Sequence, residues 1–278
     1  MPRHKPLLFF IPLACLAGGF LIALYANRNY HRPPPPAAIW APPAKPITVV
    51  SYNILHNQRG LPAVIAEIQK LQPDIVCLQE VEKNDLSRMT ELLGTYPAIY
   101  HPSENLADPH ASWGNAICSR LPLYDAGTIP NPGGGSFGVW ATALTPADNH
   151  KFQIACVHLS ATWNANPAHL IESANNRWKE LTNLSEAWRQ LGSPPILIAG
   201  DFNQIPLGNN YALMTKEWSD ALQQLGAAQP TFTGTPIQTR IDYFLLSKEW
   251  HATAGNAVNS NASDHKPIWL TAGAAPPH

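Results

Sequence analysis

Residues 196–203, with the sequence ILIAGDFN, restrict the possible fold more than any other stretch of the chain. Four consecutive apolar residues after two prolines predict a strand that is buried on both faces. Asp201 and Asn203 follow with one residue between them, so a carboxylate and an amide are expected to leave the sheet on the same side. Gly200 is expected to allow a tight turn where the strand ends. Ligand sites of open α/β sheets lie just beyond such strand ends, and the alternative is a polar loop that caps the next helix.

Further apolar runs predict that strands and helices alternate along the chain. Strands are expected at residues 47–53, 75–81, 96–100, 115–119, 138–144, 152–158, 241–246 and 268–271, in addition to the strand that ends at Asp201. Helices are expected at residues 61–71 and 85–93, and a third begins at Asn166-Pro167, a typical N-cap followed by a typical first helical residue. Because the first strand–helix–strand run carries polar residues at both strand ends, neighbouring strands are expected to face one site.

The charge of the chain is unevenly distributed, although its net charge is only −1. The first 45 residues contain five basic and no acidic residues, whereas the remainder contains 13 Lys and Arg against 19 Asp and Glu. An apolar content of 45% with 13% charged residues indicates a globular chain, and this globular part is acidic. That argues against a nucleic-acid-binding protein that depends on a large basic face, but not against a nuclease whose bound cations supply positive charge.

Residues 1–26 are interpreted as an N-terminal membrane anchor or signal segment. Residues 7–25 are almost entirely apolar, and these 19 residues are close to the length that a helix needs to span a bilayer. The apolar run is longer than that of a typical cleaved signal peptide, and Leu24-Tyr25-Ala26 is a poor cleavage site. We therefore favour a retained anchor over a cleaved signal. A lipoprotein signal at Leu13-Ala14-Cys15 is less favoured still, because the apolar run continues well past the cysteine.

Residues 27–46 are interpreted as a Pro-rich linker, and residues 47–273 as one folded domain. The linker contains Pro33-Pro34-Pro35-Pro36, Pro42-Pro43 and Pro46, which favour a semi-rigid polyproline spacer that holds the domain away from the membrane. Basic residues flank the apolar run on both sides, so they fix its orientation poorly. A single N-terminal anchor most often leaves the following domain outside the cytoplasm, and we therefore expect a periplasmic or extracellular location.

Polar residues suited to metal binding and acid–base chemistry lie at the ends of separate predicted strands. They are Asn53, Glu80, His158, Asp201, Asn203, Asp242, Asp264 and His265. Any one of them alone is most simply explained as a turn former or a core residue. Together, their oxygen atoms suit a hard divalent cation such as Mg²⁺ or Mn²⁺ rather than Zn²⁺. Two histidines would suit phosphate binding and proton transfer.

These motifs resemble, in the same order, those of the endonuclease/exonuclease/phosphatase superfamily. They are the strand that ends at Asn53, Leu78-Gln79-Glu80, Gly114-Asn115-Ala116-Ile117, Val157-His158-Leu159, Gly200-Asp201-Phe202-Asn203, Arg240-Ile241-Asp242-Tyr243 and Ser263-Asp264-His265-Lys266-Pro267. The resemblance covers roughly residues 47–272. It implies a four-layer α/β sandwich of two mostly antiparallel sheets flanked by helices, with the active site at one edge.

The resemblance also implies which residues hold the metal. Glu80 would be the main ligand of Mg²⁺ or Mn²⁺, with Asn53 beside it and Asp264 at or next to the ion. The number of ions is left open. The cation would stabilise charge on the phosphoryl oxygens during in-line attack on phosphorus.

The catalytic roles follow from the same resemblance. Asp201 would orient or deprotonate the attacking water, and Asn203 would help to hold the water and the phosphate. His265, positioned by Asp242, would contact the scissile phosphate. His158 would donate a proton or a hydrogen bond on the leaving-group side.

One residue separates this chain from part of the superfamily. Exonuclease III-like repair enzymes have a tyrosine where this chain has His158, and a lysine-rich DNA face that the acidic domain lacks, so the likeness shifts toward deoxyribonucleases and sphingomyelinases. Arg177 is a candidate phosphate contact, although a surface salt bridge on its helix is the preferred interpretation. Trp113, Trp140 and Trp163 lie near loops that flank the site strands. They could stack on a base or insert into lipid, and ordinary packing explains them at least as well.

The favoured function is a divalent-metal-dependent phosphodiesterase, most simply a membrane-tethered nuclease. The alternative is the same hydrolytic site acting on a phospholipid such as sphingomyelin, or on a phosphate monoester, for which an anchor would be convenient. A non-catalytic binding module is a third and disfavoured hypothesis, because every expected active-site residue is present. The expected partners are the phosphodiester substrate and a membrane, with no obligate protein partner, and the chain is expected to be a monomer.

Overall fold

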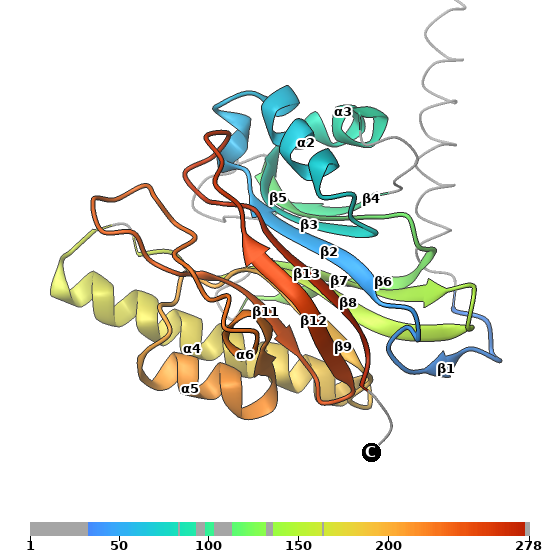
Figure 1. Cartoon of the computed structure of the whole chain (residues 1–278). Coiled ribbons are helices and arrows are strands. Elements are labelled where there is room, and N and C mark those ends of the chain that lie inside the picture. The colour runs from blue at the N-terminus through green and yellow to red at the C-terminus, as the bar shows by residue number, and fades with distance from the viewer. Residues whose placement is uncertain are drawn as a thin grey trace, which may run out of the picture.

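The computed structural model of the chain describes residues 33–82, 84–92, 98–102, 113–131, 136–162 and 164–275 (Figure 1). The predicted anchor or signal segment, residues 1–26, and Trp163 lie outside these ranges. Within them, no helix is both long enough and apolar enough to cross a membrane. Of the predicted linker, residues 33–46 are described.

The described strands form two sheets. In spatial order, the seven-stranded sheet contains β10 (Ser219–Asp220), β11 (Asp242–Leu246), β9 (Ile196–Asp201), β8 (His150–His158), β7 (Ser136–Thr145) and β6 (Leu123–Pro130), with β1 (Ile39–Trp40) pairing with the start of β8. The six-stranded sheet contains β12 (Trp250–Ala257), β13 (Ile268–Ala274), β2 (Ile47–Asn53), β3 (Ile75–Glu82), β5 (Trp113–Ser119) and β4 (Ala98–Pro102). Strands β2 and β3, β8 and β9, and β1 and β8 are parallel, and the other neighbouring pairs are antiparallel.

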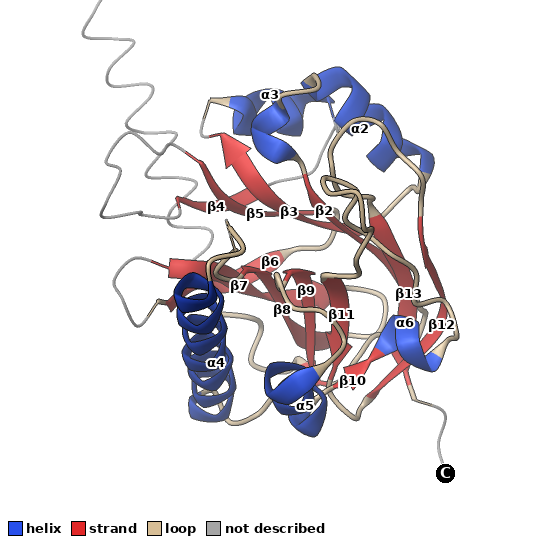
Figure 2. Cartoon of the chain, turned by 90° about the vertical axis from the view of Figure 1, so that its left-hand side faces the viewer, coloured by secondary structure: helices blue, strands red, loops and turns tan. Residues whose placement is uncertain are grey.

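Helices cover the outer faces of both sheets. Figure 2 shows α2 (Leu61–Lys70) and α3 (Asp85–Leu92) over the six-stranded sheet, and α4 (Pro167–Gln190) and α5 (Gly208–Glu217) over the seven-stranded sheet. Three groups of buried apolar side chains separate the four layers, one between the sheets and one beneath each helical layer. The predicted four-layer α/β sandwich is therefore confirmed.

Two parallel strand pairs determine which strand ends meet. β2 and β3 are joined through α2, and β8 and β9 through α4, so each sheet contains one strand–helix–strand unit. Parallel neighbours run in the same direction and end at the same edge of their sheet. Asn53 at the end of β2 pairs with Gln79, and His158 at the end of β8 pairs with Asp201. Asp242, the first residue of β11, pairs with Asp201 from the other side. The expected convergence of polar strand ends is therefore present in the fold.

Gly200 lies inside β9 and not in a turn, which corrects the sequence-based expectation. It pairs with Tyr243 of β11 and Val157 of β8. A Cβ atom at position 200 would lie 2.0 Å from the carbonyl oxygen of Val157, a separation that no side chain can occupy. Glycine is required here because neighbouring backbone approaches closely, and the chain does not turn until after Asp201.

The elements that the sequence patterns missed lack a continuous apolar run. β6 and β12 are the edge strands of their sheets, each pairs irregularly with its neighbour, and most of their residues are only partly buried. α5 buries only Asn210 and Met214, so it shows no apolar periodicity, and α6 (Ala221–Gln224) is a single turn. Edge strands and short surface helices need little apolar surface, so periodicity does not reveal them.

Residues 38–44 of the predicted linker pack against the domain. β1 pairs with the start of β8, and Pro42 and Pro43 are buried. The ring Nδ1 of His150 donates to the Pro42 carbonyl (2.8 Å), and the Ala274 N–H donates to the Pro43 carbonyl (2.9 Å). Polyproline segments make no internal hydrogen bonds, so their carbonyl oxygens are available to neighbouring donors. At least this part of the linker is attached to the domain and does not act as a free spacer.

Candidate functional site

A β-bulge in β3 directs Glu80 toward the edge where the strand ends meet. The pairing of β3 with β5 shifts between Leu78 and Val81, and Glu80 has a positive φ of 58°. Such a backbone conformation is costly for a residue other than glycine, and bulges of this kind re-aim side chains. Gln79 is fully buried and its amide reaches Cys156 on the opposite sheet, whereas Glu80 is partly exposed.

Asn53 connects the two sheets at this edge. Its Nδ2 donates to Glu80 Oε1 (2.9 Å) and to Asp201 Oδ2 (3.1 Å), and its Oδ1 accepts from the Leu55 N–H (3.1 Å). The side chain therefore presents its nitrogen to both carboxylates and its oxygen to the backbone. In this arrangement Asn53 orients Glu80 and does not itself offer an oxygen atom to a cation.

Glu80 is held as an ionised carboxylate. Burial opposes ionisation, but the hydrogen bond from His56, the charge of His158 and the hydrogen bond from Asn53 together lower the pKa of Glu80 to about 2. His56 Nε2 lies 3.0 Å from Glu80 Oε2, and His158 Nε2 lies 3.9 Å from Glu80 Oε1. An ionised, partly exposed carboxylate is a suitable ligand for a hard divalent cation.

A buried histidine links two buried aspartates on the other side of Asn53. His265 Nδ1 donates to Asp242 Oδ2 (3.0 Å), and its Nε2 lies 3.6 Å from Asp201 Oδ2. Burial favours the neutral imidazole, but the charges of Asp242 and Asp201 outweigh it and raise the pKa of His265 to about 10. Burial also raises the pKa of Asp201, although the charge of His265 opposes this. The structure thus places an imidazolium beside a carboxylate that is disposed to take up a proton.

The structure brings together six of the eight predicted residues in one network of short contacts. We call them the strand-end cluster: Asn53, Glu80, His158, Asp201, Asp242 and His265. Asn203 joins it through its backbone, because its N–H donates to Asp201 Oδ1 (2.8 Å) while its side chain donates to the Leu159 carbonyl (3.0 Å). Asp264 is less closely connected. Its carboxylate accepts from Ser263 (3.3 Å), and within the described residues no hydrogen bond or ion pair joins it to Glu80.

Two of the predicted tryptophans, both half-buried, pack against neighbouring residues. The Trp113 ring contacts the rings of His56 and His158, with centroids 5.2 and 5.5 Å away. Trp140 lies against Gly127, where a Cβ atom would come within 2.8 Å of its ring. Trp113 therefore supports two imidazoles beside Glu80, and ordinary packing accounts for Trp140.

His56 and Glu82 belong to the site, and sequence reasoning missed both. His56 lies in the 3₁₀ turn η1 (Leu55–Asn57) that directly follows β2, and its Nδ1 lies 3.3 Å from Glu82 Oε1. Its hydrogen bond to Glu80 raises the pKa of His56. Both residues lie close in sequence to predicted site residues: His56 comes three residues after Asn53, and Glu82 comes two residues after Glu80. This proximity could have indicated them.

Arg177 is not a surface salt bridge, contrary to the preferred sequence-based interpretation. Its side chain is buried under the loops that follow β8 and β9, where it donates to the Ser160 carbonyl (2.9 Å), Thr162 Oγ1 (3.0 Å) and Gln204 Oε1 (3.4 Å). Burial lowers the pKa of Arg177, and the charge of Glu180 opposes this. Arg177 therefore ties together the loops after His158 and Asn203.

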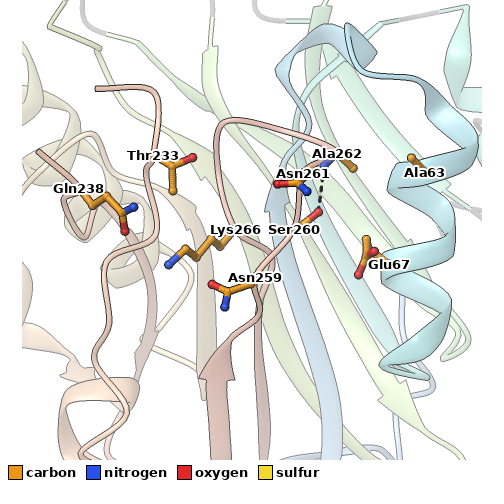
Figure 3. Close-up of a pocket in the computed structure, with 9 residues that line it drawn as sticks. All are labelled: Ala63, Glu67, Thr233, Gln238, Asn259, Ser260, Asn261, Ala262 and Lys266. Atoms are coloured by element: carbon orange, nitrogen blue, oxygen red, sulfur yellow. Dashed lines mark hydrogen bonds between the residues drawn. The ribbon is translucent and has the colours of Figure 1, made fainter. Parts of the chain in front are cut away.

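A polar pocket lies next to the segment that carries His265 but contains no member of the strand-end cluster. Its volume is about 670 Å³, and Figure 3 shows it between α2 and two loops, with Glu67 on one side and Lys266 and Gln238 on the other. Thr233 in its lining donates to the Asp264 carbonyl (2.8 Å), so the pocket wall is joined to the site segment. Its lining contains no histidine, and its one acid, Glu67, pairs with Lys70, so the pocket lacks the groups that the strand-end cluster brings together.

The donor atoms at the site fit a divalent cation. Glu80 offers ionised oxygens that are partly exposed, and Asp201, Asp242 and His265 form a second group whose ligand atoms lie within 4.8 Å of one another. The second group is buried and its atoms already bond to each other, so a cation there would have to break the His265–Asp242 pair. Glu80 is the better candidate ligand, because it can accept a cation without breaking the buried histidine–aspartate pair.

The raised pKa of His265 predicts a pH-dependent stability. A histidine whose folded pKa exceeds its unfolded value of about 6.5 stabilises the fold fully below pH 6.5, and this contribution disappears as the pH rises toward 10. In metal-free protein, the free energy of unfolding should fall between pH 7 and pH 10 by on the order of 2 kcal/mol more in the wild type than in His265→Gln. Urea unfolding at several pH values measures this. If the free energy of unfolding changed with pH equally in the two proteins, the assignment of a charged His265 would be contradicted.

Comparison with known proteins supports this interpretation of the fold. The sequence model of the Endonuclease/Exonuclease/phosphatase family matches residues 50–265. Similar solved structures include a family protein from Bacteroides thetaiotaomicron (18% identity, TM-score 0.69, 84% of this chain and 99% of that one) and the human Nocturnin catalytic domain with bound sulfate (21%, 0.67, 84% and 95%). A mannosyl-6-phosphatase from Bacteroides thetaiotaomicron is also similar (18%, 0.67, 81% and 99%). No curated protein sequence matches the chain.

The family model therefore assigns the chain to a class of hydrolases that act on phosphoester bonds. The chain belongs to the Endonuclease/Exonuclease/phosphatase family, whose model covers most of its length.

Proposed function

We propose that this protein is a divalent-metal-dependent phosphodiesterase and that its substrate is a nucleic acid. The observation that carries the proposal is the strand-end cluster, in which Asn53 donates to both Glu80 and Asp201, and His265 Nε2 lies 3.6 Å from Asp201 Oδ2. The cluster thus joins an ionised Glu80, a proton-accepting Asp201 and a charged His265. A phosphate that entered this space would meet positive imidazole on one side and a base for water on the other.

Asp201 is the general base in this proposal. Its Oδ1 is fixed by the Asn203 N–H, and its Oδ2 faces Asn53, His158 and His265. The raised pKa of Asp201 brings its proton affinity closer to that needed to take a proton from water near neutral pH. The backbone contact with Asn203 and the hydrogen bond from Asn53 hold the carboxylate in one orientation.

The two histidines have separate roles. His265 is kept protonated by Asp242 and supplies a fixed positive charge for a phosphoryl oxygen. His158 lies 3.5 Å from Asp201 Oδ2 and is held by the Trp113 ring, so it is placed to donate a proton to a leaving group. Glu80, oriented by Asn53, would hold the divalent cation, which when bound supplies Lewis-acid stabilisation of the phosphoryl charge.

One observation favours a phospholipid as the second candidate substrate. Ile205 and Leu207, directly after Asn203, are exposed to 42% and 67%, and Leu170 and Ile171 of the adjacent α4 to 44% and 63%. Exposed apolar side chains beside a site are typical of surfaces that contact lipid. A phosphate monoester is a further alternative within the same chemistry. Residues 1–26 would tether the domain to a membrane, with the domain outside the cytoplasm, and this too is a proposal.

Removing the metal or its ligand is expected to abolish hydrolysis. The assay follows product release from DNA, RNA, sphingomyelin and a sugar phosphate, with Mg²⁺ or Mn²⁺ and with excess chelator. The wild type should cleave nucleic acid, and chelation or Glu80→Gln should lower the rate about 100-fold or more. Cleavage of sphingomyelin without cleavage of DNA or RNA would transfer the proposal to the second candidate. Turnover that survives chelation would contradict metal dependence.

A further inference from the structure

His56 is the group at the site that the proposed mechanism leaves without a role. Its imidazole lies between two glutamates, with Nε2 3.0 Å from Glu80 Oε2 and Nδ1 3.3 Å from Glu82 Oε1. The side chain is 28% exposed, so a small ion can reach it. It comes from the turn after β2, and both glutamates come from β3, so neighbouring strands hold the three groups together.

We propose that His56 is a second ligand of the cation that Glu80 binds, with Glu82 as the residue that orients its ring. This inference rests on the proposed metal-dependent function and names the class of metal. It gives the site a mixed imidazole–carboxylate donor set, which suits a transition cation such as Mn²⁺ or Co²⁺ better than Mg²⁺.

The distance between the two donor atoms fits one shared ion. Two ligands at right angles in an octahedral site, each about 2.1 Å from the ion, are about 3.0 Å apart. His56 Nε2 and Glu80 Oε2 have this separation already. The cation would replace the proton that now lies between them, and the proton would leave to solvent.

The contact of His56 Nδ1 with Glu82 resembles the hydrogen bond that usually orients a metal-binding histidine. A histidine ligand usually donates its other ring N–H to a carboxylate, which fixes the tautomer and the ring orientation. Glu82 provides such a carboxylate at Nδ1, which leaves Nε2 directed at Glu80. The Trp113 ring, 5.2 Å away and nearly perpendicular, restricts the ring from the side.

The backbone around His56 also shows that its position is closely specified. Leu55, His56 and Asn57 have φ values of 51°, 48° and 59°, three consecutive non-glycine residues in the left-handed region. Such conformations are costly and persist where the surroundings impose them. Here the Asn53 side chain accepts from the Leu55 N–H, and the Asn57 side chain donates to Asp85 (3.1 Å).

The test measures the ligands of bound Mn²⁺ directly. Pulsed EPR of the full chain loaded with Mn²⁺ detects coupling to a ligand nitrogen, and a titration that follows free Mn²⁺ and its competition with Mg²⁺ gives both affinities. The variants are His56→Asn, His158→Asn, Glu80→Gln and Glu82→Gln. Asparagine suits position 56 because it tolerates a left-handed backbone. His251→Asn, at an exposed site on β12, is the matched control.

Wild type, His158→Asn and His251→Asn should all show the nitrogen coupling, and His56→Asn should lose it. His56→Asn should also weaken Mn²⁺ binding about 10-fold or more, with less than a threefold change for Mg²⁺, and Glu82→Gln should weaken Mn²⁺ binding about 10-fold. Absence of coupling in the wild type, or coupling that persists in His56→Asn and disappears in His158→Asn, would overturn the inference while leaving the proposed function intact. Failure of Glu80→Gln to weaken binding of either ion would instead contradict the proposed function.

Discussion

Replacing Asp201 with asparagine is expected to lower kcat for phosphoester hydrolysis about 1,000-fold and to leave the fold intact. The substitution keeps the shape of the side chain and removes the group that takes the proton from water, an effect in the range measured for general bases. Asn203 and Asn53 both donate to Asp201, so an amide at this position would also turn one NH₂ group toward a donor. Single-turnover rates with saturating substrate, together with the circular dichroism spectrum, test this expectation.

Asp148→Asn is the matched control for this change. Asp148 precedes β8 at the end opposite His158, and it accepts from backbone N–H groups of Ala44 and His150. Its substitution should leave kcat within about twofold, because among the described residues no member of the strand-end cluster contacts it. If Asp201→Asn keeps more than a tenth of the wild-type rate, Asp201 is not the base, and His158 becomes the next group to test.

Replacing Gly200 with alanine is expected to destabilise the protein by about 3 kcal/mol or more. The new methyl group would collide with the Val157 carbonyl at 2.0 Å and with carbon atoms of the same residue at 2.9 and 3.0 Å. β8 and β9 cannot separate to relieve the collision without breaking hydrogen bonds in the middle of the sheet. Because His158 and Asp201 end these two strands, the distance between them should also change.

Gly192→Ala is the control that separates the steric collision from the backbone strain of replacing a glycine with alanine. Gly192 has a φ of 85°, and no atom lies within 4 Å of the position where its Cβ would be. Alanine there should lower the free energy of unfolding by only about 1 kcal/mol, because a left-handed backbone is strained for any residue with a Cβ atom. Urea unfolding of both variants measures the two values. Equal destabilisation would mean that backbone conformation, and not contact with Val157, makes glycine necessary at position 200.

The strand-end cluster could be predicted from the sequence because it depends on short-range patterns. Apolar runs that stop at Asn53, Glu80, His158 and Asp201 predict strands with polar ends, and strand–helix–strand units place such ends together. The alternation of strands and helices followed from the same runs, whereas the four-layer sandwich followed from the family resemblance. What the runs could not predict was the exact direction of each side chain. Glu80 faces the site only because of a bulge, which depends on how β3 pairs with β5.

The sequence spacing of two further residues, Arg177 and His56, relates to where they lie in the structure. Arg177 lies four residues before Leu181 and seven before Leu184, so the periodicity that predicts the buried face of α4 places Arg177 on that face. Because arginine is usually exposed, a surface salt bridge was the preferred interpretation, whereas Arg177 is buried. His56 could be found from its place after Asn53, but its contact with Glu80 depends on three left-handed residues that no sequence rule predicts.

The attachment of β1 to the start of β8 sets the direction in which the catalytic edge would point on an anchored protein. β1 pairs with β8 at His150, whereas the strand-end cluster begins at His158, roughly 26 Å away along an extended strand. If residues 1–26 hold the protein to a bilayer, the short stretch before β1 would leave the catalytic edge turned outward, away from the lipid. An outward orientation gives access to polymers that arrive by diffusion and makes lipids of the same bilayer difficult to reach.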